Sequence, residues 1–134
     1  EVLSTPRVLQ IGHTLPAATI AEPAWATALQ ARGAEVLLLA NPSGKVDLAA
    51  LLQELGRRGI NEVHVEAGFK LNGSLLREGL VDELLLYLAP SLIGDASRGL
   101  FNLPELATLS EKRVLQWRDV RQVGADLRVI ARLT

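Results

Sequence analysis

The stretch from Val63 to Gly94 reads VHVEAGFKLNGSLLREGLVDELLLYLAPSLIG, and it decides how this chain should fold. An apolar segment ends at Glu66, two glycines follow five residues apart, and a helix-like segment leads into a second apolar run. This order predicts a strand, a helix and a strand, with a carboxylate and a glycine-lined helix start at the carboxyl edge of a sheet. Open α/β sheets bind their ligands at that edge, so a binding site is expected here.

The rest of the chain continues the same alternation of apolar segments and amphipathic segments. The pattern predicts strands at 7–12, 35–40, 61–66 and 83–89, and helices at 22–32, 48–58 and 70–78. Asp47 is expected to cap the second of these helices, and 91–109 is expected to be a loop. The runs 113–123 and 126–133 alternate around Gly124 and Ala125, which indicates a hairpin. We therefore expect one α/β domain over 1–134, with a mainly parallel sheet, helices on both faces and a C-terminal antiparallel hairpin.

Composition narrows the classes of function. The 134 residues carry a net charge of −1 without a long basic run, which argues against a nucleic-acid surface. The chain has no cysteine and only two histidines far apart in sequence, so neither disulfides nor a metal site is expected. No apolar run reaches the roughly 18 residues of a membrane span. A cytoplasmic protein without membrane or nucleic-acid partners is the expectation.

The helix start after Glu66 is the candidate ligand-binding turn. A helix start carries unpaired N–H groups and partial positive charge, and glycine lets an anion approach the backbone. The candidate cofactor-binding residues are Gly68, Phe69, Lys70, Leu71, Asn72, Gly73 and Ser74. The alternative is that the glycines serve only the sterics of a strand-to-helix junction. The GxGxxG fingerprint of dinucleotide-binding folds is absent.

Glu66 is the candidate substrate-binding residue, because it ends an apolar strand beside that turn. A carboxylate there either faces the cleft and accepts hydrogen bonds from a polar substrate, or caps the next helix or faces solvent. His64 alternates with two valines and is expected to be a packed or surface residue. No residue is assigned as a catalytic nucleophile or acid, which suits a hydride transfer in which the cofactor carries the chemistry.

Three motifs carry a resemblance to a known family: VEAGFKLNGSLL at 65–76, GLVDELLLYLAPSLIG at 79–94 and SRGLF at 97–101. Together they resemble the C-terminal reductase domain of the bifunctional riboflavin biosynthesis deaminase/reductase. The resemblance implies a dihydrofolate-reductase-like fold and NADPH as cofactor. It also implies that Glu66 contacts the substrate and that Gly68 to Ser74 form the NADPH-binding turn. Many family members have Gly-Gly where this chain has Ala67 and Gly68.

The implied reaction is the NADPH-dependent reduction of 5-amino-6-(5-phosphoribosylamino)uracil, in which the ribosyl side chain becomes ribityl. The resemblance further implies a covalently attached N-terminal deaminase domain. A homodimer is also expected, because a sheet truncated at its N-terminus exposes an edge or apolar face that favours association. Since the chain begins after the family's first strands and without Met, we expect a C-terminal fragment with weak or no activity by itself. Two alternatives remain open: a non-catalytic dimerisation or binding module, and another dihydrofolate-reductase-like enzyme acting on a pteridine-like substrate.

Overall fold

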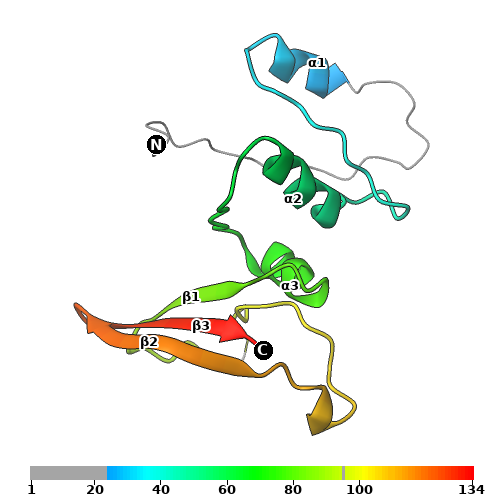
Figure 1. Cartoon of the computed structure of the whole chain (residues 1–134). Helices are drawn as coiled ribbons and strands as arrows, with labels where there is room; N and C mark the ends of the chain where they lie inside the picture. The colour runs from blue at the N-terminus through cyan, green and yellow to red at the C-terminus, as the bar shows by residue number, and fades with distance from the viewer. Residues whose placement is uncertain (1–23, 95) are drawn as a thin grey trace. The chain divides into compact units, whose positions relative to one another are not determined.

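The computed structural model describes residues 24–94 and 96–134. The chain divides into two compact units, Glu1–Glu62 and Val63–Thr134, and each is described by itself. Figure 1 shows helices α1 and α2 in the first unit, and helix α3 with strands β1, β2 and β3 in the second. The sequence-based expectation of one domain over 1–134 stays a prediction.

The described part of the first unit, residues 24–62, contains two short helices, α1 (Ala24–Gln30) and α2 (Leu48–Arg57). The predicted cap of α2 is confirmed, because the Asp47 carboxylate accepts a hydrogen bond of 2.9 Å from the Ala50 N–H. The leucines of α2 repeat at helical spacing, and three of them form its buried side: Leu48, Leu51 and Leu55.

Helix α2 ends in a turn that satisfies its last carbonyls. The N–H groups of Arg58, Gly59 and Ile60 donate to the carbonyls of Glu54, Gly56 and Leu55. Gly59 has a φ of 76°, a left-handed conformation that favours glycine. The Glu54 carboxylate accepts hydrogen bonds from Arg58 and Arg57, which hold the pKa of Glu54 below its ordinary value.

The second unit is built on an antiparallel sheet of β1 (Glu83–Leu88), β2 (Leu115–Val123) and β3 (Asp126–Leu133), in the order β1-β3-β2. The predicted C-terminal hairpin is confirmed, with its turn at Gly124, whose φ is 63°. Val129 on β3 pairs with Leu86 on β1 and with Val120 on β2, so one face of the sheet is apolar. Val129 and Ala131 are buried on that face.

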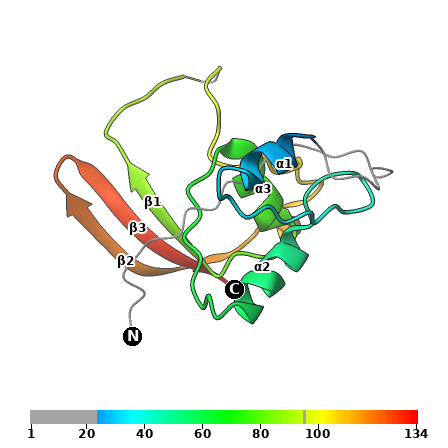
Figure 2. The same cartoon turned by 90° about the horizontal axis from the view of Figure 1, so that it is seen from above.

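Helix α3 (Phe69–Arg77) precedes the sheet and starts one residue before the predicted bound. It lies at the end of the sheet where β1 begins, and the β2–β3 turn lies at the opposite end (Figures 1 and 2). Leu75 and Leu76 supply its buried side. The segment between β1 and β2 is irregular, as predicted, apart from a short 3-10 helix at Leu109–Glu111.

Two of the predicted strands are wrong. Residues 35–39 and 61–66 belong to no strand, and Ala40 forms only an isolated antiparallel bridge with Val46. All strand pairs among the described residues are antiparallel, so the parallel sheet is not confirmed. The physical reason is that an apolar run indicates an extended chain, whereas a strand also requires a neighbouring backbone to pair with. The predicted strand at 7–12 and the first residues of the 22–32 helix lie outside the described residues.

Candidate functional site

The first turn of α3 has backbone N–H groups that no side chain caps. Gly68 is the N-cap residue, with φ −83° and ψ 169°, and no side chain caps the helix there. Asn72 donates the first intrahelical hydrogen bond, 3.1 Å to the Gly68 carbonyl. The preceding N–H groups, from Gly68 to Leu71, therefore lack intrahelical partners and carry the positive end of the helix dipole.

Steric need does not explain a glycine at position 68. A Cβ added to Gly68 would meet nothing within 4 Å, and the φ of this residue is one that any amino acid adopts. The backbone is thus accessible because a side chain is missing and the space around it is free. An anion can approach the helix start at this point.

The opposite end of α3 is closed by hydrogen bonds. The Glu78, Gly79 and Leu80 N–H groups donate over 3.0 to 3.1 Å to the carbonyls of Ser74, Leu76 and Leu75, respectively. The Arg113 guanidinium donates to the remaining carbonyl, that of Arg77, at 3.4 Å. All four terminal carbonyls have partners, so only the start of α3 offers unpaired backbone groups to a ligand.

The last three residues of the predicted cofactor turn have structural partners within the chain. The Asn72 amide donates to the Ala67 carbonyl at 3.0 Å, which ties the helix to the residue before its cap. The Ser74 hydroxyl accepts a 2.9 Å hydrogen bond from Arg77. Gly73 is buried inside the helix. The predicted turn therefore has an open part, Gly68 to Leu71, and a part that holds it in place, Asn72 to Ser74.

At Gly73 the steric explanation for glycine applies. A Cβ added there would lie 2.4 Å from the Asn102 carbonyl oxygen and 2.6 Å from the Asn102 nitrogen. The backbone of Asn102 therefore packs directly on the helix, which only glycine permits. The Asn102 N–H also donates to the Phe69 carbonyl at 3.0 Å. The contact could not be read from the sequence, in which 29 positions separate Gly73 from Asn102.

Glu66 is a surface residue three positions before α3. Its side chain is 88% exposed, and one carboxylate oxygen lies 3.4 Å from the His64 Nε2. His64 is itself exposed, as the sequence allowed, but its approach to Glu66 was missed. The sequence contained a signal for this approach, because His64 and Glu66 are two positions apart and such side chains lie on the same side of an extended chain. Glu66 accordingly has free acceptor capacity for a polar ligand.

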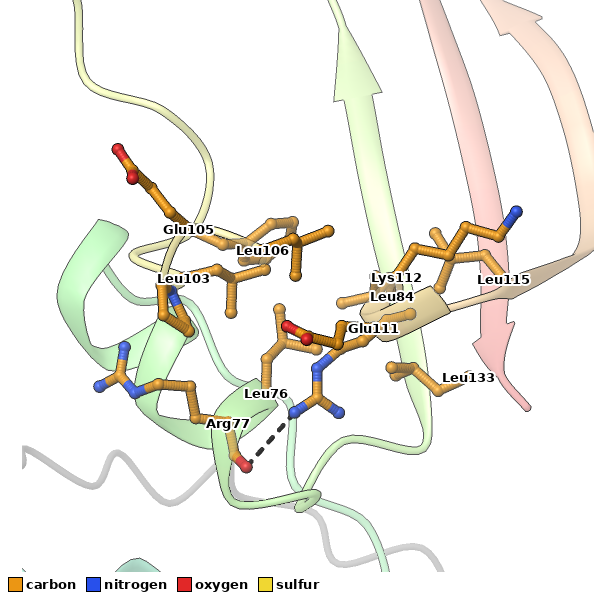
Figure 3. Close-up of a pocket in the computed structure, with 13 residues that line it drawn as sticks. Leu76, Arg77, Leu84, Leu103, Glu105, Leu106, Glu111, Lys112, Leu115 and Leu133 are labelled. Carbon is orange, nitrogen blue, oxygen red and sulfur yellow. Dashed lines mark hydrogen bonds between the residues drawn. The ribbon is translucent and has the colours of Figure 1, made fainter. Parts of the chain in front are cut away.

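A cavity of about 540 Å³ lies at the other end of α3 and outside the predicted site. Leu76, Leu84, Leu103 and Leu133 give it apolar walls, with Arg77 and Glu111 among the polar side chains around it (Figure 3). A helix of nine residues is roughly 13 Å long at 1.5 Å per residue, so this cavity and Gly68 are separated by most of the helix.

Within 24–94 and 96–134, no helix is long and apolar enough to cross a membrane. The same residues contain no group of three or more His, Asp or Glu side chains that could hold a metal ion.

The second unit thus combines an antiparallel sheet with a helix, α3, whose start has no side-chain cap. The family described as RibD C-terminal domain matches residues 5–129, and the chain belongs to this family. The resemblance inferred from the three motifs is thereby confirmed.

Individual relatives agree with this assignment. The chain is 44% identical over 91 residues to the riboflavin biosynthesis protein RibD of Escherichia coli (strain K12), which covers 68% of this chain and 25% of that protein. It is 36% identical over 86 residues to the 5-amino-6-(5-phosphoribosylamino)uracil reductase of Buchnera aphidicola subsp. Acyrthosiphon pisum, covering 64% of this chain and 42% of that protein. The solved structure of Acinetobacter baumannii RibD has a TM-score of 0.70 and 30% identity, covering 81% of this chain and 29% of that one. The matched part is thus about a quarter of the length of the RibD proteins.

Proposed function

We propose that this chain forms part of an NADPH-dependent reductase of riboflavin biosynthesis that acts on 5-amino-6-(5-phosphoribosylamino)uracil. The relatives named above support the pathway and the reductase class. The observation that carries the cofactor part is the open start of α3 at Gly68, since its unpaired N–H groups suit a pyrophosphate.

Within this proposal the cofactor turn has two kinds of residue. Gly68, Phe69, Lys70 and Leu71 present the helix start to the pyrophosphate, and the exposed Lys70 adds positive charge beside it. Asn72, Gly73 and Ser74 keep the turn in position through their contacts with Ala67, Asn102 and Arg77. When bound, NADPH supplies the hydride that reduces C1′ of the ring-opened ribosylamine.

Glu66 is proposed to orient the substrate by accepting hydrogen bonds from its hydroxyl or amino groups. A carboxylate acceptor forms stronger hydrogen bonds than a neutral one, and the Glu66 side chain is exposed, with one oxygen 3.4 Å from the His64 Nε2. We assign no proton donor. A homodimer, a fused deaminase domain and a cytoplasmic location remain predictions.

The cofactor proposal is tested by titrating the chain with NADPH, using cofactor fluorescence and calorimetry. Gly68→Asp should abolish binding, because the introduced carboxylate caps the helix start and repels the pyrophosphate. Gly68→Ser is the matched control, with a similarly small but neutral side chain, and should weaken binding less. Wild-type chain that binds no NADPH, or Gly68→Asp chain that binds as well as wild type, would contradict the proposal.

The substrate role is tested with Glu66→Gln, which keeps the size of the side chain and removes its charge. In an NADPH oxidation assay with the ribosylamino-uracil substrate, KM should rise about tenfold, the loss expected for a hydrogen bond to a charged group. The Kd for NADPH should stay unchanged. An unaltered KM in an active preparation would remove Glu66 from the substrate site.

A further inference from the structure

The segment at 97–102 is attached to both ends of α3, although it follows the helix by some twenty residues. At the start of the helix, the Asn102 N–H donates to the Phe69 carbonyl at 3.0 Å. The Phe69 ring also approaches Gly99, where an added Cβ would lie 3.9 Å from it. The first residue of α3 is thus contacted on its backbone and on its side chain by the same segment.

Arg77, in the last turn of α3, makes the third attachment. One nitrogen of its guanidinium donates to the Asn102 carbonyl, and the other donates to the Ser74 hydroxyl at 2.9 Å. The Asn102 peptide therefore has its N–H bound to the start of the helix and its carbonyl bound to Arg77 near the end. Between these points it lies on Gly73, where a Cβ would be 2.4 to 2.8 Å from its atoms.

Segment 97–102 is not held firmly by apolar packing on the side where it borders the cavity. The residues on both sides of Asn102 border the cavity of about 540 Å³, which Phe101 lines. Leu103 and Leu106 also line it (Figure 3). Leu100 and Leu103 are 56% and 41% exposed. An incompletely filled apolar region gives weak positional restraint, so the hydrogen bonds of Asn102 must supply it.

Arg77 suits this task for a chemical reason. Its planar guanidinium directs two N–H groups at two separate oxygens. The ammonium group of lysine is a compact point charge and does not reproduce this planar arrangement. Among the residues that the structure describes, Arg77 has no ion-pair partner, and both of its acceptors are neutral oxygens. Its charge is therefore used for holding Asn102 and Ser74 and not for a surface ion pair.

From these contacts we propose that Arg77 is a positioning residue for the cofactor site. By holding the Asn102 carbonyl it keeps segment 97–102 against Phe69, and so keeps the open helix start at Gly68 in the geometry that receives the pyrophosphate. The inference rests on the proposed NADPH-binding function and adds a residue that the cofactor does not touch.

The test compares Arg77→Gln and Arg77→Lys with wild type, measuring the Kd for NADPH and the hydrogen-exchange rate of the Asn102 amide. Arg77→Gln should raise the Kd about tenfold, as expected for a lost charge-assisted hydrogen bond, and should speed exchange at Asn102. Arg77→Lys should show a smaller change in both. Arg77→Lys keeps the aliphatic part of the side chain and its positive charge. It therefore supplies the Kd and the exchange rate if Arg77→Gln does not fold.

Two controls separate positioning from general stability. Arg57 occupies the corresponding place in the last turn of α2 and pairs with Glu54, so Arg57→Gln should leave the Kd for NADPH and the exchange rate of the Asn102 amide unchanged. Asn102→Ala keeps the backbone that Arg77 binds, and should also leave the Kd unchanged. If Arg77→Gln and Arg77→Lys bind NADPH like wild type, the positioning role is wrong and the proposed function stands. If wild type binds no NADPH, the proposed function fails and this inference fails with it.

Discussion

Helices α2 and α3 end in the same way and begin differently. After each helix, three consecutive N–H groups donate hydrogen bonds to carbonyls of its last turn. A glycine there adopts a positive φ, 76° at Gly59 and 69° at Gly79. At the start, α2 has the Asp47 carboxylate over its N–H groups, whereas α3 has Gly68 and no side-chain cap. Both helices thus end with their last carbonyls paired, and of these two helices α3 is the one whose start has no side-chain cap.

The glycines inside the two helices should respond in opposite directions to alanine, and this is the largest effect we expect. Gly73→Ala should cost about 2 to 3 kcal/mol, because the new Cβ would overlap the Asn102 backbone. Gly56→Ala should stabilise by up to about 1 kcal/mol, because its Cβ meets nothing within 4 Å and alanine favours helix. Urea unfolding followed by circular dichroism measures both. Equal effects would mean that Asn102 does not pack on α3.

The two closing glycines should respond equally. Gly59→Ala and Gly79→Ala should each cost about 1 to 2 kcal/mol, because both force alanine into the left-handed region without any other clash. Thermal unfolding of the two variants provides the comparison. A much smaller loss in one of them would show that the two helix ends are not equivalent.

The two helix starts should respond with opposite signs. Asp47→Ala should destabilise by about 1 kcal/mol, because it removes the cap of α2. Gly68→Asp should stabilise by a few tenths of a kcal/mol, since aspartate is a better cap than glycine and the space is free. Amide hydrogen exchange in each helix reports the local change. If Gly68→Asp binds NADPH poorly while it stabilises α3, a ligand role for the open start is favoured over a stability role.

The smallest expected difference is in acid sensitivity. Hydrogen bonds from Arg58 and Arg57 lower the pKa of Glu54 below its ordinary value of 4.5. A lowered carboxyl pKa contributes stability that is present above the ordinary value and is lost as pH falls through the folded-state pKa. Glu54→Gln should therefore reduce the loss of α2 stability below about pH 4.5. Hydrogen exchange in α2 and α3 on lowering the pH checks this, and α3 should be unaffected by the substitution. An unchanged acid response of α2 would contradict it.

Local patterns allowed several elements to be predicted. Helix α2 with its Asp47 cap, helix α3, strand β1 and the hairpin β2–β3 all depend on periodicity, capping residues and turn glycines close together in the chain. The strands at 35–40 and 61–66 were wrong because their apolar runs carry no information about which backbone would pair with them. The candidate turn shows the same limit: its two glycines, Gly68 and Gly73, predicted a helix start, but the packing of Asn102 on Gly73 was not predicted.

The sequence by itself determined the bounds of α2 and α3 to within one residue, the hairpin, the lack of cysteine and, through its motifs, the family. Only the tertiary structure decided that Gly68 and Gly73 have different roles, one leaving backbone N–H groups open and the other admitting the Asn102 backbone. The physical reason is the separation along the chain of the residues that interact. Capping and turns depend on residues a few positions apart, whereas a close backbone approach and the Arg77 contact join segments that are distant in the chain and meet only when it folds.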